Sequence, residues 1–161
     1  MFTLDGVRKF HDWTHASLNL LLDHLSSIPT IDYEKVVPNF GFPTLREQVI
    51  HIFNCEGFWI YTLQGLPYND RESADCPTVT DAKLFEQDVA LQTRTYLSGL
   101  TDQQLNSAVE LKFSDEDGAI RTPAFVLHHI LTHAFHHKGQ IVAMCRALGH
   151  PASDTDLFRF G

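Results

Sequence analysis

The stretch that decides the fold runs from Thr122 to Gly149 and reads TPAFVLHHILTHAFHHKGQIVAMCRALG. Thr122 can accept a hydrogen bond from a free amide of the first helical turn, and the proline that follows suits the first helical position. Gly149 can adopt the left-handed conformation that commonly ends a helix. The stretch therefore predicts one long helix with both ends marked.

One face of this predicted helix is apolar except at its centre. Spacings of three and four place seven residues on a single stripe: Val126, Ile130, His133, His137, Ile141, Met144 and Leu148. Side chains four residues apart on a helix have Cβ atoms about 5 to 6 Å apart, so His133 and His137 can share one metal ion. His129 extends the series by one turn, whereas His136 should point elsewhere.

The His-x-x-x-His pair has a second interpretation, as two hydrogen-bonded core histidines. A chain with 10 histidines produces this spacing easily by chance. However, each ring buries donors and acceptors that cost about 1 to 3 kcal/mol if they are unmatched, and a metal ion satisfies one nitrogen on each ring. The position of the pair in an apolar stripe therefore favours metal ligation without excluding the other interpretation.

Length and charge limit the function classes. With 161 residues the chain should form a single domain, residues 1–161. A formal net charge of −8 argues against binding to nucleic acid or to an acidic membrane surface. No signal peptide and no apolar run of about 20 residues is found, which predicts a cytoplasmic protein. Three cysteines without a C-x-x-C pair argue against disulfides and a cysteine-type zinc site.

Apolar residues at helical spacing predict three further helices, over residues 4–25, 44–65 and 80–99. Residues 28–43 and 65–77 are expected to be loops, because both are rich in proline and turn-forming residues. Alternation over residues 108–113, a turn-rich break at residues 114–118 and the apolar pair that follows predict a small β-hairpin before the last helix. The expected fold is therefore all-α: a four-helix bundle with a hairpin insert.

Four more candidate residues lie on the other helices. His11 and His15 are one turn apart on a face whose burial is not clear, which favours solvent-facing or cavity-lining side chains over ligands. His51 lies beside the apolar stripe of its helix, where a packed or partly exposed role is the more common one. Glu56 lies on that stripe, so its carboxylate must be paired, either behind a ligating histidine or at an open end of the bundle.

The chain resembles a known family, the DinB-like (YfiT-like) metal-dependent four-helix bundle proteins. The likeness covers nearly the whole chain and includes Trp13, the segment Gln48-Val49-Ile50-His51-Ile52 with Trp59 and Gly65 after it, His133-x-x-x-His137-Lys138-Gly139-Gln140-Ile141, and Leu148-Gly149-His150-Pro151. The His-x-x-x-His-(Arg/Lys)-Gly-Gln run is the most specific part. Lys138 stands where an arginine is frequent.

The resemblance implies a ligand set and a topology. One histidine of the second helix and two of the last bind a divalent metal in that family, and the matching positions here are His51, His133 and His137. It also implies an up-down-down-up arrangement, homodimers, and transfer of low-molecular-weight thiols or thiol-dependent isomerisation. The family name records a link to DNA damage, and so to stress response.

Three imidazoles leave a divalent ion at least one open position, which is the pattern of catalytic zinc sites. Zinc and nickel suit imidazole, while iron and manganese stay open. The leading hypothesis is a metal-dependent transferase that uses a low-molecular-weight thiol, or a related hydrolase or isomerase. Its rival is a non-catalytic metal-binding or dimerising bundle. Glu56 is the candidate catalytic residue, and four other residues are candidates to line the pocket or support the ligands: His15, Cys55, His129 and Gln140.

Overall fold

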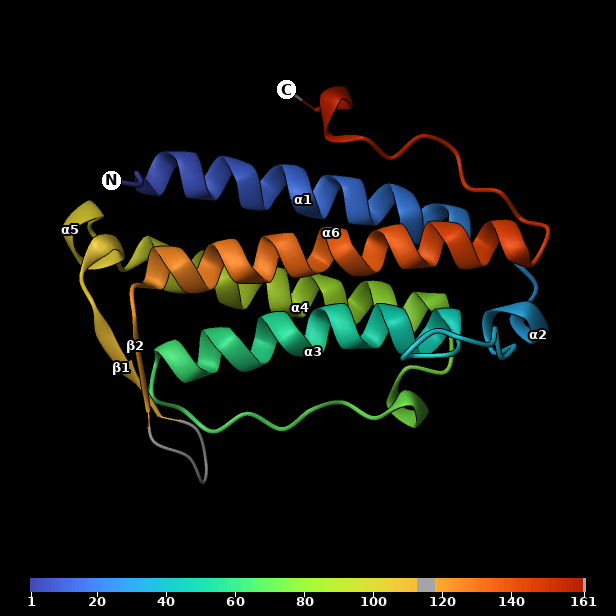
Figure 1. Cartoon of the computed structure of the whole chain (residues 1–161), viewed down its shortest axis with the longest axis horizontal. Coiled ribbons are helices and arrows are strands. Elements are labelled where there is room, and N and C mark those ends of the chain that lie inside the picture. Colours follow the sequence, from blue (N-terminus) through green and yellow to red (C-terminus); the bar gives the residue numbers. More distant parts are fainter. Residues whose placement is uncertain (113–117, 161) are drawn as a thin grey trace.

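Four long helices form the body of the protein in the computed structural model, which describes residues 1–112 and 118–160 (Figure 1). They are α1 (Leu4–Leu25), α3 (Leu45–Leu63), α4 (Val79–Ser98) and α6 (Pro123–Ala147). The shorter elements are the helices α2 (Thr30–Tyr33) and α5 (Asp102–Asn106), the 3-10 turns η1 (Ser73–Asp75) and η2 (Leu157–Arg159), and the strands β1 (Val109–Leu111) and β2 (Ala119–Arg121).

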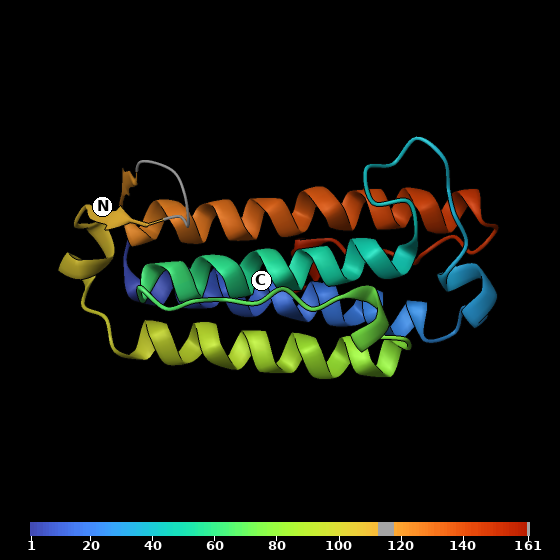
Figure 2. The ribbon, with the colours of Figure 1, turned by 90° about the horizontal axis from the view of Figure 1, so that it is seen from below.

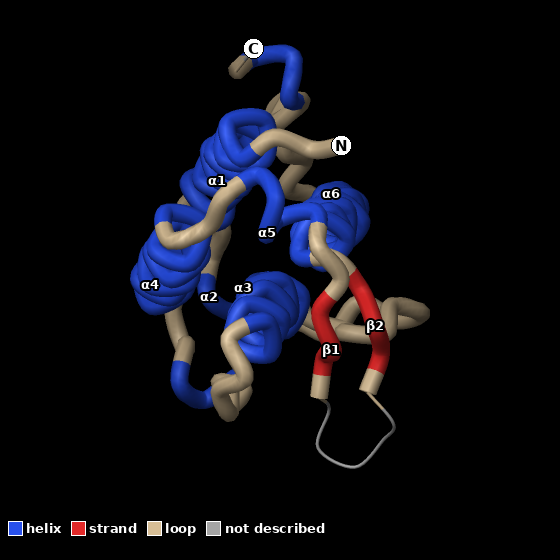
Figure 3. The backbone as a smooth tube through the Cα atoms, turned by 90° about the vertical axis from the view of Figure 1, so that its left-hand side faces the viewer, coloured by secondary structure: helices blue, strands red, loops and turns tan. Residues whose placement is uncertain are grey.

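The four long helices run up, down, down and up, as predicted. The segment after α3 returns along the length of the bundle before α4 begins, so α3 and α4 run in the same direction (Figures 1 and 2). Seen end on, α1, α4, α3 and α6 follow one another around the bundle (Figure 3). Each helix therefore packs beside two others, and α3 lies between α4 and α6.

Threonine side chains cap the N-termini of the long helices. The Thr122 hydroxyl accepts from the amide of Phe125, as expected. Thr44 forms a capping box with Glu47. The predicted start of the third helix at residue 80 is wrong by one position, because Thr78 caps α4 through a capping box with Asp81.

The core follows the predicted stripes. On α6 the apolar stripe residues Val126, Ile130, Ile141 and Met144 are buried. One core cluster lies toward the α2 end of the bundle around Phe53 and Phe85, and another contains residues of β1, α5 and the start of α6. Burial of these stripes supplies the main driving force for packing four amphipathic helices together.

The predicted hairpin is confirmed and the predicted loops are partly corrected. β1 and β2 pair antiparallel, with Val109 opposite Arg121 and Leu111 opposite Ala119. The end of the predicted first strand and most of the predicted turn fall in residues 113–117, outside the described residues. Residues 28–43 are not all loop, because Thr30–Tyr33 forms α2, and α5 was not expected either. Both helices are shorter than the windows in which helical periodicity becomes visible.

The long connection after α3 is held against the bundle by Asn54. The Asn54 amide donates to the carbonyl oxygen of Arg71 (2.9 Å), and its own oxygen accepts from the Arg71 backbone N–H (2.9 Å). Gly57 allows the close approach, because a Cβ there would lie 2.4 Å from the Tyr68 hydroxyl oxygen. This connection covers α3 and α4.

Within the described ranges, no helix is long and apolar enough to cross a membrane.

Candidate metal centre

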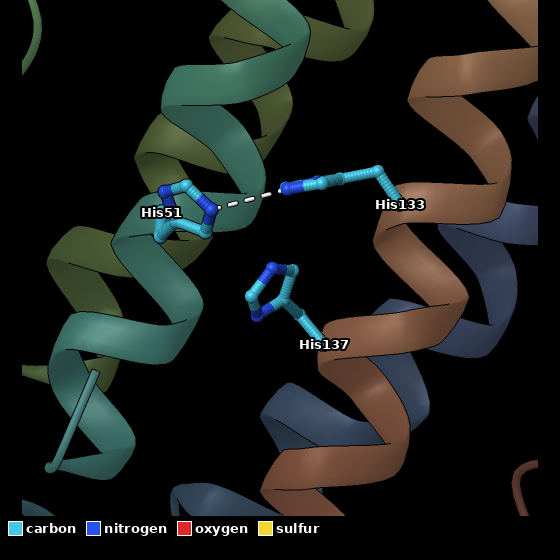
Figure 4. Close-up of side chains that lie close together, drawn as sticks. All are labelled: His51, His133 and His137. Atoms are coloured by element: carbon cyan, nitrogen blue, oxygen red, sulfur yellow. Dashed lines mark hydrogen bonds between the residues drawn. The ribbon is translucent and has the colours of Figure 1, made fainter. Parts of the chain in front are cut away.

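Three histidines from two helices meet on one side of the bundle. His51 projects from α3, and His133 and His137 project from α6 toward it (Figure 4). The Nε2 atoms of His51 and His133 are 3.1 Å apart, and one ring nitrogen from each histidine lies within 4.8 Å of the others. His137 is buried and the other two are half-buried. We call His51, His133 and His137 the histidine trio.

A glutamine fixes the tautomer of His137. The Gln48 amide nitrogen donates to the carbonyl oxygen of Phe42 (2.9 Å), which can only accept, so the Gln48 side-chain oxygen must face the other way. That oxygen lies 2.7 Å from Nδ1 of His137 and must accept its hydrogen. The Nε2 atom of a neutral His137 therefore carries a free lone pair, as a metal ligand needs.

The same amide nitrogen extends the network outward. Gln48 also donates to the side-chain oxygen of Gln140 (2.8 Å), and the Gln140 amide donates to Nε2 of His136 (2.7 Å). His136 is exposed and bonds Gln140 instead of joining the trio, although its ring lies 4.9 Å from that of His137, and Gln140 supports His137 through Gln48. On the other side the Phe42 ring stacks on His51 with centroids 3.9 Å apart. These contacts hold two of the three rings in place.

The surroundings keep all three imidazoles neutral. Burial lowers the pKa of His133, and together with the neighbouring His137 and His51 rings, which are potential positive charges, it brings this pKa to about 3. Burial and the same kind of neighbour lower the pKa of His137 to about 4. Burial also lowers the pKa of His51. At pH 7 the trio therefore presents lone pairs and not charges, which suits a divalent cation.

A small cavity lies one helical turn along from the trio. The His129 ring lies 5.8 Å from the His133 ring and 5.5 Å from Trp59, measured between centroids. Together with residues of the hairpin and the start of α6, these two side chains line a cavity of about 230 Å³: Trp59, Leu111, Ala119, Arg121, Phe125, Val126 and His129. His129 thus lines a pocket, as expected, and the apolar walls of the cavity suit the apolar part of a small molecule.

Cys55 is a poor candidate for a fourth ligand. Burial and the nearby Glu56 carboxylate together raise the pKa of its thiol to about 12. A thiol ligates as its thiolate, which this environment disfavours. In the described part of the chain, the trio is a group of three histidines with no cysteine or carboxylate among them.

The carboxylate of Glu56, the candidate catalytic residue, contacts α1 and α4. Its carboxylate accepts from Nε2 of His11 (2.9 Å) and from Nε2 of His15 (3.0 Å), both on α1. The Thr93 hydroxyl on α4 donates to the same carboxylate (2.5 Å). Glu56 is thus paired with histidines, as a buried carboxylate must be, but its partners are not members of the trio.

The expectation that His11 and His15 face solvent or a cavity is wrong. Their side chains are 1% and 2% exposed, and Glu56 and Glu86 are each 3% exposed. The other nitrogen of His15, Nδ1, donates to Glu86 (2.6 Å). Burial alone would lower the pKa of His15, but the two carboxylates outweigh it and raise this pKa to about 9. We call His11, His15, Glu56 and Glu86 the buried cluster.

Sequence reasoning missed two residues of the site. Gln48 was noted only as part of the family resemblance, although its place one turn before His51 puts it near the same face of α3. Phe42 lies in the connection before α3, where no periodicity indicates which side chains turn inward. For neither residue does the sequence indicate which side chain it contacts in the site.

An up-down-down-up bundle with three neutral histidines between its second and last long helices defines a class of helical protein with a candidate metal centre. The DinB family model matches residues 1–161, and the chain belongs to this family.

Known relatives share the chain's whole length or a large part of it. Protein DinB of Bacillus subtilis (strain 168) is 22% identical over 158 residues, which is 94% of this chain and 91% of the relative. The uncharacterized protein YizA of the same organism is 28% identical over 108 residues, 67% of each chain. The crystal structure of a DinB-like protein from Bacillus cereus ATCC 10987 matches with a TM-score of 0.63 and 22% identity, covering 96% of this chain and 99% of that one. This last likeness establishes the fold.

Proposed function

We propose that His51, His133 and His137 hold a divalent metal ion with an open position, and that the protein is a metal-dependent transferase using a low-molecular-weight thiol, or a related hydrolase or isomerase. The observation that carries the proposal is the hydrogen bond from His137 to Gln48 (2.7 Å), which directs an unprotonated Nε2 toward the other two rings. Hydrogen bonds of this kind behind a ligating histidine are typical of metal sites.

A divalent ion on these rings would lower the pKa of a bound thiol or water and so supply a nucleophile near neutral pH. Zinc and nickel suit the all-imidazole donor set best, and iron and manganese are the alternatives. The chain's own part is to keep the rings neutral, to orient His137 through Gln48, and to leave His51 and His133 half-buried so that a small molecule can reach them. Cys55 takes no part as a nucleophile, since its pKa of about 12 keeps it protonated.

The proposal assigns no step to Glu56, the candidate catalytic residue, because its carboxylate is occupied by His11, His15 and Thr93. The cavity lined by Trp59 and His129 is the better candidate for substrate binding. A non-catalytic metal-binding bundle is the alternative and requires a closed site. Among the described residues no fourth protein donor joins the three histidines, and an apolar cavity lies beside them; both features favour turnover over that alternative.

We propose further that the protein acts in the cytoplasm as a homodimer, with a role in stress response and without binding nucleic acid. The homodimer and the role in stress response rest on the family resemblance, and the absence of nucleic-acid binding on the net charge of −8. Sedimentation analysis tests the dimer, and a single monomeric species at all concentrations would contradict it.

The test begins with elemental analysis of untagged protein purified without chelators. We expect roughly one divalent ion per chain bound by the trio. The variants His51→Ala and His137→Ala should both lose this ion. His136→Ala is the matched control, because His136 is the neighbour of His137 on α6 but bonds Gln140 instead of joining the trio. Equal losses in all three variants would show that the wrong face of α6 has been assigned.

The second stage tests turnover. Wild-type protein, apoprotein and His137→Ala should be assayed for consumption of thiols such as glutathione or cysteine with an electrophile such as a bimane. Thiol conjugation that needs both the metal and His137 supports the transferase. Stoichiometric metal with no turnover across a broad panel of thiols and electrophiles would favour the non-catalytic alternative.

A further inference from the structure

The buried cluster holds two carboxylates and two imidazoles for which the proposed function has no use. It joins three helices, since His11 and His15 come from α1, Glu56 from α3 and Glu86 from α4. All four residues are no more than 3% exposed. No lysine or arginine of the described residues forms an ion pair with either carboxylate.

The two buried carboxylates need positive charge beside them. Two protonated imidazoles can supply it, and so can one divalent cation held between two neutral imidazoles. The second arrangement is open to this cluster because a ring nitrogen of His11, a ring nitrogen of His15 and a carboxylate oxygen of Glu56 lie within 4.8 Å of one another.

The donor atoms are also spaced as ligands of one ion. Nε2 of His11 and Nε2 of His15 lie 2.9 Å and 3.0 Å from the two oxygens of Glu56. Metal–ligand bonds of about 2.0 to 2.2 Å place neighbouring ligand atoms roughly 3 Å apart. We propose that His11, His15 and Glu56 form a second, buried site for a divalent first-row transition-metal ion, which cross-links α1 to α3.

Glu86 and Thr93 have supporting roles in this site. Glu86 accepts the Nδ1 hydrogen of His15 (2.6 Å), which is how a carboxylate orients a ligating histidine toward a metal ion. Thr93 donates to Glu56 and so fixes the direction of its carboxylate. Because solvent does not reach these side chains, the ion would stabilise the bundle and take no part in turnover. Two histidines and one carboxylate suit zinc, iron or manganese.

The test removes the trio first. The full-length variant His51→Ala/His133→Ala/His137→Ala and the wild type are purified without chelators, dialysed against Zn²⁺ or Co²⁺, and analysed for metal content. We expect roughly two equivalents per chain in the wild type and one in the triple variant. Cobalt in the triple variant should show the visible absorption of a low-symmetry site with nitrogen and oxygen ligands.

Further variants in the triple background assign the remaining ion. Adding Glu56→Gln should abolish it. If that protein does not fold, Glu86→Gln keeps the three ligands and should weaken Zn²⁺ binding by about 10- to 100-fold at unchanged helix content. His24→Ala is the control, since His24 lies on α1 but bonds the carbonyl oxygen of His150. The His24→Ala substitution should leave metal content and Zn²⁺ affinity unchanged.

The outcomes separate this site from the trio. One equivalent of metal in the wild type and none in the triple variant would overturn the proposal. The buried cluster would then bind protons instead of a metal ion. One equivalent in both proteins, removed by the Glu56 or Glu86 substitution, would support the buried site and contradict metal binding by the trio. An ion in the triple variant that survives both substitutions would overturn the assignment to this cluster.

Discussion

The trio and the buried cluster use the same side chain in opposite ways. In the trio, three imidazoles face one another with no carboxylate among them, and the pKa values of His133 and His137 fall to about 3 and 4. In the buried cluster, His15 lies between two carboxylates and its pKa rises to about 9. The difference shows that burial alone does not decide the charge of a histidine: it disfavours the charged form in both places, and the neighbours decide the outcome.

The largest expected difference between the two regions is in stability. Replacing Glu56 by alanine removes the acceptor of His11, His15 and Thr93 and leaves a buried imidazolium with one partner fewer. We expect the metal-free protein to lose about 3 to 5 kcal/mol of unfolding free energy. Urea denaturation in the presence of a chelator measures it.

The matched control is His51→Ala, on the same helix but in the trio. It should cost about 1 kcal/mol in the metal-free protein, because this half-buried ring forms no charged pair there. Similar losses in the two variants would show that the two regions do not differ in the way described.

A smaller effect is expected for the residue that orients the trio. Replacing Gln48 by leucine removes the acceptor of the His137 Nδ1 hydrogen, and the ring can then adopt the other tautomer. Metal affinity at the trio should fall about 10- to 100-fold, measured by competition with a coloured chelator. Gln140→Leu, which removes only the next link of the network, should have a smaller effect. Unchanged affinity in the Gln48 variant would remove the tautomer argument.

The smallest effect is a difference in how stability depends on pH. For His133 and His137 the folded pKa values lie below 6.5, so the unfolded chain binds more protons and stability falls as pH drops from about 6.5 toward 4. For His15 the folded pKa lies above 6.5, so its contribution is full below about 6.5 and is lost as pH rises through about 9.

Denaturation of metal-free protein between pH 4 and about 9.5 measures both limbs. His133→Ala should flatten the acid limb and leave the alkaline limb in place, whereas Glu86→Gln should flatten the alkaline limb, because it removes one of the carboxylates that raise the pKa of His15. A variant that alters both limbs equally would contradict the separation of the two regions.

The fold could be predicted from the sequence because the patterns that indicate its helices and its hairpin are local. Caps, stripes at spacings of three and four, and the alternating residues of the hairpin are all visible within short windows. The His133 and His137 pair was visible for the same reason. The burial of His11 and His15 was not, because the polar residues Thr14 and Ser17 interrupt the apolar pattern around them.

The partners of the site residues are distant in sequence. His15 meets Glu86 across 71 positions, and His137 meets Gln48 across 89. Such pairs depend on which helices become neighbours, and on their rotation about their own axes. A single sequence shows neither which helices become neighbours nor how each helix is rotated about its axis. The histidine partners of Glu56 could not be predicted for this reason, since its spacing from His51 says only that both lie on α3.

Helix α3 contributes His51 to one region and Glu56 to the other. Five positions on an α-helix correspond to a rotation of roughly 140°, so the two side chains leave α3 on different sides. Any rotation of α3 about its long axis therefore moves both side chains at once. A rotation that brings His51 toward α6 moves Glu56 away from α1, and the opposite rotation does the reverse. Contacts that fix the rotation of α3 about its axis on one side of the helix therefore also fix the position of the side chain on its other side.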